Sequence, residues 1–161
     1  AQKIEATQCD YAGFNLFIGD RHQAVYMSNR GEAPQVLPKG VYVTSNGLMT
    51  EHLEKTKHLR KRFTQEFLPM LQVSSIPHHE IEYAAWDILE DERKISSELL
   101  PNTGIAHDME ELLSSTFIQS PIYGTRCSNL LLMKNIEFKW FEKTQQGEQQ
   151  GQIIHIQKTL N

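Results

Sequence analysis

Cysteine is scarce in this sequence of 161 residues. The two cysteines, Cys9 and Cys127, lie far apart and form no CxxC motif, which argues against a structural disulfide or zinc site and favours a reducing cytoplasm. No apolar run approaches the roughly 18 residues that span a membrane, and the start AQKIEATQ lacks the pattern of a signal peptide. Acidic residues outnumber basic ones by 20 to 16. The resulting net charge of -4 argues against a general nucleic-acid binder.

The composition that remains is that of an ordinary soluble globular protein, with 39% apolar and 22% charged residues. The length suits a single domain over residues 1–161 that buries a useful core. There is no internal repeat, and a strand-like run begins soon after Ala1. A removed initiator methionine explains this abrupt start, and so does a missing upstream half.

A strand followed by a long helix organises the first half of the chain. β-Branched and aromatic side chains at 41–44 (VYVT) predict the strand. Thr50 offers a hydroxyl to cap the helix, and Glu51 places negative charge at its positive end. Many folds place ligand-binding groups at such a junction, so Ser45 and Asn46 are candidate site residues.

Hydrophobic periodicity and turn residues predict the other elements. Strands are predicted at 11–18, 24–27, 125–133, 136–143 and 152–158, and helices after residue 50, at 77–92 and at 108–115. Two groups of three strands are thus separated by a helical middle. This order indicates an α+β fold with antiparallel sheets.

One side of the predicted helix after Thr50 is basic. Its cations are Lys55, Lys57, Arg60, Lys61 and Arg62. A solvated helix face explains this pattern, and so does a wall that attracts anions beside Ser45 and Asn46. Glu51 and Lys55 are spaced for a stabilising pair within the helix.

A second polar cluster, residues 123–129 (YGTRCSN), leads into the apolar strand NLLLM. Arg126 is a rim residue or pairs with a structural carboxylate, or else it grips a ligand carboxylate or orients a catalytic group through its planar fork. Cys127 is either a nucleophile or a small buried hydrophobe, because the sequence fixes no histidine near it.

The seven histidines follow no metal-ligand spacing. His78 and His79 are adjacent, so on a helix they diverge by about 100° and do not chelate together. A single imidazole is able to ligate haem iron, but the sequence does not select one.

Four blocks occur in a specific order: YAGFNLFIGD, VYMSNRGEAP, LPKGVYVTSNGLM and LLPNTGIAHDMEELLSSTFIQSPIYGTRCSNLLLM. Together they resemble the NRDE family, also called the transport-and-Golgi-organisation protein 2 family, over about residues 11–141. The family's Asn-Arg-Asp-Glu motif and the cysteine at its second position are missing from this sequence. The resemblance therefore implies the C-terminal part of a longer domain that lacks its N-terminal segment.

The resemblance implies an αββα sandwich like that of the N-terminal-nucleophile hydrolases. In that architecture Asn46 corresponds to the oxyanion donor of a Thr-Asn or Ser-Asn turn, and Arg126 to an arginine on a late strand. Both are therefore candidate catalytic residues, and an amide donor of this kind contributes about 3–4 kcal/mol. The Pro-Trp-Pro-Lys-like segment that family members carry after the turn is replaced here by residues 51–55 (EHLEK).

The function that the resemblance implies is the binding or trafficking of a small molecule, haem above all, in the cytoplasm. Haem would then be a cargo rather than a resident cofactor, held in a cleft bordered by Ser45, Asn46, Thr125 and Arg126. One alternative is a hydrolase of linear amides whose cysteine nucleophile lies in the missing segment. A scaffold with a decayed cleft is a third interpretation, and composition does not separate the three.

Overall fold

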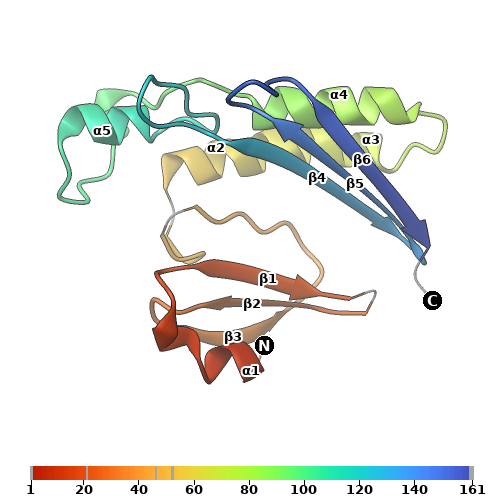
Figure 1. Cartoon of the computed structure of the whole chain (residues 1–161), viewed down its shortest axis with the longest axis horizontal. Helices are drawn as coiled ribbons and strands as arrows, with labels where there is room; N and C mark the ends of the chain where they lie inside the picture. Colours follow the sequence, from red (N-terminus) through yellow and green to blue (C-terminus); the bar gives the residue numbers. More distant parts are fainter. Residues whose placement is uncertain (1, 21, 46, 52, 160–161) are drawn as a thin grey trace. The chain divides into compact units, whose positions relative to one another are not determined.

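The computed structural model describes residues 2–20, 22–45, 47–51 and 53–159 (Figure 1). The chain divides into two compact units, Ala1–His52 and Leu53–Asn161. Each unit contains one three-stranded antiparallel sheet, and most of the helical residues lie in the second unit. The predicted α+β fold is confirmed, whereas the αββα arrangement and the single domain over residues 1–161 stay predictions.

The sheet of the first unit has the strand order β1-β2-β3. Its strands are β1 (Asn15–Gly19), β2 (Ala24–Ser28) and β3 (Glu32–Leu37), preceded by the short helix α1 (Gln2–Glu5) and a 3-10 turn, η1 (Gln8–Asp10). Tyr26 and Met27 of β2 are fully buried. The Tyr26 hydroxyl donates to Asn15 Oδ1 at 2.7 Å and accepts from the Met49 N–H at 3.1 Å. These bonds satisfy a phenol that burial would otherwise leave unpaired.

The third strand is not where the sequence predicts it. Residues 41–44 form no strand, and β3 occupies the Pro-containing segment 32–37, where the sequence predicts no strand. β3 lies at the edge of its sheet, where Pro34 is tolerated because an outward-facing residue needs no N–H. The segment 41–45 is held instead by Asn15, whose amide donates to the carbonyls of Ser45 and Gly47, both at 2.9 Å.

The helices of the second unit form an ordered series. They are α2 (Glu54–Arg62), a π-helical turn (Phe63–Phe67, η2), α3 (Leu68–Met70), α4 (His78–Leu89), the 3-10 turn η3 (Ser97–Leu99) and α5 (His107–Leu112). The predicted start at Thr50 is wrong, because α2 begins at Glu54 after Leu53, with no side-chain cap. No helix in the described part of the chain is long and apolar enough to cross a membrane.

The second sheet has the order β4-β5-β6 and matches the predicted strands closely. Its strands are β4 (Cys127–Lys134), β5 (Glu137–Thr144) and β6 (Ile153–Thr159). Asn135 makes the tight turn between the first two with φ 56°. At the start of β6, Gly151 has φ 84°; its N–H donates to the Thr144 carbonyl and the Thr144 N–H donates to the Gln152 carbonyl. This is the pattern of a bulge that requires glycine.

The core of the second unit lies between the helices and one face of this sheet. It contains Phe67, Ile81, Ala85, Trp86, Ile88, Leu130 and Phe141. In Figure 1, α4 runs across the sheet, and α4 contacts β4. Along β4, Ser128 and Leu130 are buried, whereas Asn129 and Leu131 are exposed. The sheet therefore has one covered face and one face that is largely open.

Candidate functional site

A pocket of about 490 Å³ opens in the second unit, just before β4. Two segments line it, residues 117–126 and residues 145–147 with Gln150. Thr125 and Arg126, two of the predicted ligand-binding residues, are both part of this lining. The sequence did not single out most of the other lining residues as site residues. Gly124 and the two glycines of residues 145–152 (QQGEQQGQ) indicate only that these segments are turns.

The loop at residues 118–125 is closed at its base by a pair of hydrogen bonds. The Thr125 N–H donates to the Ile118 carbonyl at 2.8 Å, and the Ile118 N–H donates to Thr125 Oγ1 at 3.0 Å. Near the tip, the Ser120 hydroxyl donates to the Tyr123 carbonyl and accepts from the Tyr123 N–H. Thr125 thus holds the shape of the pocket wall through its hydroxyl.

Gly124 lets this wall fold back closely on itself. A Cβ at this position would lie 2.7 Å from the Ile118 carbonyl oxygen and 2.6 Å from Gln146 Nε2. Real Cβ atoms essentially never come so close to a backbone oxygen, so the two segments approach in this way because residue 124 is glycine.

Arg126 is the only charged residue among the described residues that line the pocket. Its backbone carbonyl accepts the Gln145 N–H at 2.9 Å, which anchors the residue at the start of the sheet. Its side chain is exposed, and within the described part of the chain it makes no ion pair. The structural-carboxylate interpretation is therefore not supported, and the guanidinium remains available to an anion.

The other two predicted ligand-binding residues lie in the first unit. Ser45 is half-buried, and its carbonyl accepts the Asn15 amide. Asn46, the predicted oxyanion donor, lies outside the described residues. The predicted cleft bordered by Asn46 and Arg126 therefore stays a prediction.

Cys127 is exposed at the start of β4, so its interpretation as a buried hydrophobe is wrong. The Asn129 amide lies within donating distance of its Sγ, 3.5 Å away, and Asn129 Oδ1 accepts from the Trp140 indole N–H at 2.8 Å. A cysteine nucleophile needs a base such as histidine. No histidine hydrogen-bonds to the Cys127 sulfur in the described part of the chain.

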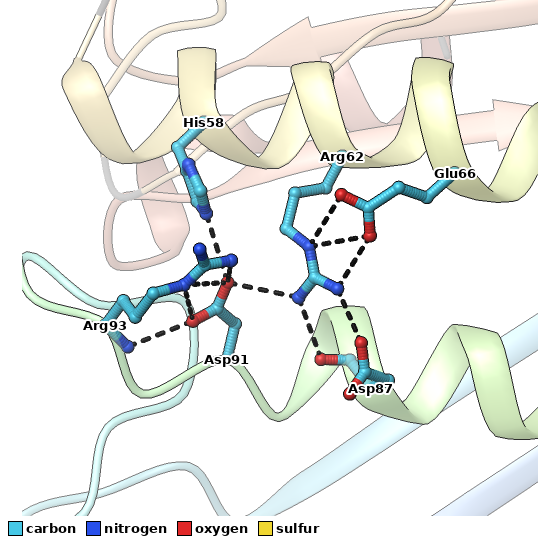
Figure 2. A network of polar contacts seen from close by, with 6 residues as sticks. All are labelled: His58, Arg62, Glu66, Asp87, Asp91 and Arg93. Carbon is cyan, nitrogen blue, oxygen red and sulfur yellow. Dashed lines mark hydrogen bonds and ion pairs between the residues drawn. The ribbon is translucent and has the colours of Figure 1, made fainter.

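Two cations on the basic side of α2, Lys55 and Arg62, have partners within the second unit, and Figure 2 shows those of Arg62. Arg62, only 12% exposed, contacts Glu66 at 2.7 Å, Asp87 at 2.5 Å and Asp91 at 3.1 Å. Lys55 donates to the Leu113 carbonyl at 2.8 Å instead of pairing with Glu51, which precedes the helix. Lys55 and Arg62 are bonded to protein groups, so they are neither free to attract an anion nor fully solvated.

Asp91 lies at the centre of this network and was not singled out from the sequence. Its carboxylate is 5% exposed and contacts Arg93 at 2.6 Å, Arg62 at 3.1 Å and the His58 ring at 3.0 Å. The hydrogen bonds from Arg93 hold the pKa of Asp91 well below its ordinary value, with a smaller contribution from His58. The network joins α2 to the end of α4, as Figure 2 shows, so its role is structural.

Among the residues that the structure describes, no three His, Cys, Asp or Glu side chains are grouped to hold a metal ion. His107 contacts the Ser97 hydroxyl at 2.8 Å and His78 contacts Lys139 at 3.1 Å, so both rings have protein partners. The structure does not select a histidine for haem iron.

Comparison with protein families gives one match. The family model described as Transport and Golgi organisation 2 matches residues 1–147, which is most of the chain and includes both sheets up to the end of β5 as well as the pocket wall at 117–126. A comparison with curated proteins gave no significant match.

Proposed function

From the premise that the chain belongs to the Transport and Golgi organisation 2 family, we propose that it binds an amphipathic anionic small molecule beside Arg126. Haem is the ligand that we favour, carried as a cargo in the cytoplasm. The binding site is the pocket in front of β4, and Arg126 contacts a carboxylate of the ligand.

The observation that carries this proposal is the charge of the pocket. The chain is acidic overall, with a net charge of -4, yet the described lining contains one arginine and no carboxylate. An unpaired guanidinium offers two parallel N–H groups to a carboxylate, a geometry that a lysine does not reproduce. The pocket therefore favours an anionic ligand, although the chain as a whole is negatively charged.

The remaining lining suits a ligand with an apolar body. The lining includes the apolar residues Ile118, Pro121, Ile122 and Tyr123 and the amide residues Gln119, Gln146 and Gln150. The Gln145 amide is buried and donates to Glu90 and Ser128 instead. A volume of about 490 Å³ lies within the range of pockets that hold small molecules. Haem combines a flat apolar ring with two propionates, so it matches both parts of this lining.

The test is a titration of the chain with haem, in which the Soret absorbance reports binding. We expect a saturable shift, and Arg126→Ala should weaken binding by about 10- to 100-fold because it removes a charge-assisted contact of about 1.5–3 kcal/mol. Arg126→Lys should recover only part of this loss. Lys134→Ala is the matched control, since it removes one positive charge at the far end of β4.

Two outcomes would contradict the proposal. Absence of a saturable shift with the wild-type chain excludes haem, and equal losses in Arg126→Ala and Lys134→Ala exclude Arg126 as the contact. A long-chain acyl carboxylate or an acyl-CoA that competes with haem at the same site would extend the ligand class to lipids.

The hydrolase alternative depends on two residues that the pocket does not contain. One is Asn46 as the oxyanion donor, and the other is a cysteine nucleophile that the resemblance places upstream of this sequence. It therefore stays a prediction.

A further inference from the structure

β6 forms one edge of the second sheet, and among the described strands it pairs only with β5. The hydrogen bond from the Thr144 N–H to the Gln152 carbonyl sets the phase of this pairing. In an antiparallel pair every second residue bonds to its neighbour, so Ile154, Ile156 and Lys158 bond to β5. The backbone groups of the residues between them, at 153, 155, 157 and 159, consequently point away from the sheet.

This edge has few of the features that usually protect exposed strands. β3, one of the two edge strands of the first sheet, contains Pro34. β6 contains no proline, and Lys158 is its only residue with a full charge at neutral pH. Six of its seven residues are exposed, including Ile153 and Ile154 at 47% and 56%. A long, regular and nearly uncharged edge is a template for another strand.

We propose that β6 pairs antiparallel with β6 of a second copy of this chain. A two-fold axis perpendicular to the sheet keeps each face on the same side, so some residue must lie opposite itself. Full overlap of the seven residues places Ile156 opposite Ile156. In this register His155 faces Gln157 and Ile153 faces Thr159, and all four carry outward-pointing backbone groups. The phase of the hydrogen bonds therefore fits the symmetric pair.

The side chains of the open face are also complementary in this register. Ile154 lies between Glu142 on β5 and Lys158 of the second copy, which puts these charges two strand spacings apart, about 10 Å between backbones. Two long side chains of opposite charge can meet across that distance. In the described part of the chain neither Glu142 nor Lys158 has an ion-pair partner of its own.

The sharpest test uses the position that lies opposite itself. In analytical ultracentrifugation, the wild-type chain should have twice the mass of a single chain, which is 18.6 kDa. Ile156→Lys and Ile156→Asp should each be monomeric, because each places like charges directly opposite one another. Mixing the two variants should restore a dimer, since the lysine then faces the aspartate.

Leu131→Lys is the matched control. It adds the same charge to the same face of the sheet, but on β4, which lies two strands away from the β6 edge. This variant should remain dimeric, and circular dichroism should show that all variants are folded.

Three results would overturn the proposal. A wild-type chain that is monomeric up to its solubility limit would exclude the pair of β6 strands. This holds even if β6 accepts a strand from another protein instead. Dissociation by Leu131→Lys as complete as that by Ile156→Lys would indicate packing of faces rather than of edges. A mixture of the two Ile156 variants that stays monomeric would exclude the symmetric register.

Discussion

Asp91 shows how much one buried carboxylate can organise. It is surrounded by three cationic or protonatable side chains from two directions, Arg62 and His58 on α2 and Arg93 just after α4. Placing a charge in a buried position is costly unless hydrogen bonds and counter-charges surround it. Here they do, and the carboxylate in turn fixes the ends of two helices.

We expect Asp91→Asn to lower the free energy of unfolding by about 3 kcal/mol, because it leaves Arg62 and Arg93 without their shared partner. Glu66→Gln is the control: Glu66 is 52% exposed, so its loss should cost under about 1 kcal/mol. Urea denaturation measures both. Similar losses in the two variants would contradict a special role for Asp91.

Asp91 also predicts a pH dependence. Its pKa in the folded chain lies below the value of about 4 in an unfolded chain. The unfolded state therefore binds the proton first on acidification, and the stabilisation present above pH 4 is lost as the pH falls through the folded-state pKa. The slope of stability against pH below about 4 should be shallower in Asp91→Asn than in the wild-type chain.

Turns and loops set the positions of the strands at the scale of the elements. Asn135, in the turn before β5, and Gly151, in the connection after β5, both have positive φ. Gly124 allows the pocket wall to approach Ile118 closely. Each of these positions demands a backbone conformation or an approach that ordinary side chains resist. Small changes at these positions should therefore have measurable effects.

Asn135→Val should destabilise the chain by about 1–2 kcal/mol, because a β-branched residue resists the left-handed conformation at φ 56°. Asn135→Gly should leave stability unchanged or raise it slightly. The predicted loss corresponds to a fall in Tm of roughly 2–8 °C, measurable by differential scanning calorimetry. Equal Tm values for the valine and glycine variants would contradict the assignment of the turn.

Gly124→Ala should reduce binding at the pocket, because the new methyl group would lie 2.7 Å from the Ile118 carbonyl oxygen and push the loop away. Gly40→Ala is the control, since its Cβ would meet only the Tyr42 ring, at ordinary contact distances of 3.4 Å or more. Haem titrations of the two variants give the comparison. If Gly124→Ala binds as tightly as the wild-type chain, the loop is not part of the site.

Strong local patterns made most of the second unit predictable. The sequence predicts a helix at 77–92, where α4 lies, and it predicts the three C-terminal strands to within a few residues. β3 was missed because Pro34 signals a loop unless the strand is known to lie at an edge. The Thr50 cap failed because cap residues are common outside helices. Asp91 was invisible because its partners are distant in sequence, and only tertiary packing brings them together.

The whole chain offers two exposed thiols, Cys9 and Cys127, and neither has the surroundings of a nucleophile. The nearest polar partner of Cys9 is the Asp10 carboxylate at 3.8 Å, and that of Cys127 is the Asn129 amide at 3.5 Å. A thiol is activated by a neighbouring cation or by a histidine base, whereas the Asn129 amide is neutral and the negative charge of Asp10 disfavours a thiolate beside it.

We therefore expect the 161-residue chain to show no hydrolysis of linear amides such as penicillin V. Liquid chromatography measures the release of product, and a Cys127→Ser variant is measured in parallel. Turnover that disappears in Cys127→Ser would make this cysteine the nucleophile and contradict the expectation.

The π-helical turn after α2 has a consequence for the evolution of this segment. The Leu68 N–H bonds back to the Phe63 carbonyl, so this turn accommodates one residue more than an α-helix would. Thr64 and Gln65 in the turn are exposed, whereas Phe67 is 2% exposed in the core. A deletion of one residue here restores an uninterrupted α-helix without rotating the flanking segments. A relative that lacks one residue at this point should therefore keep the same core.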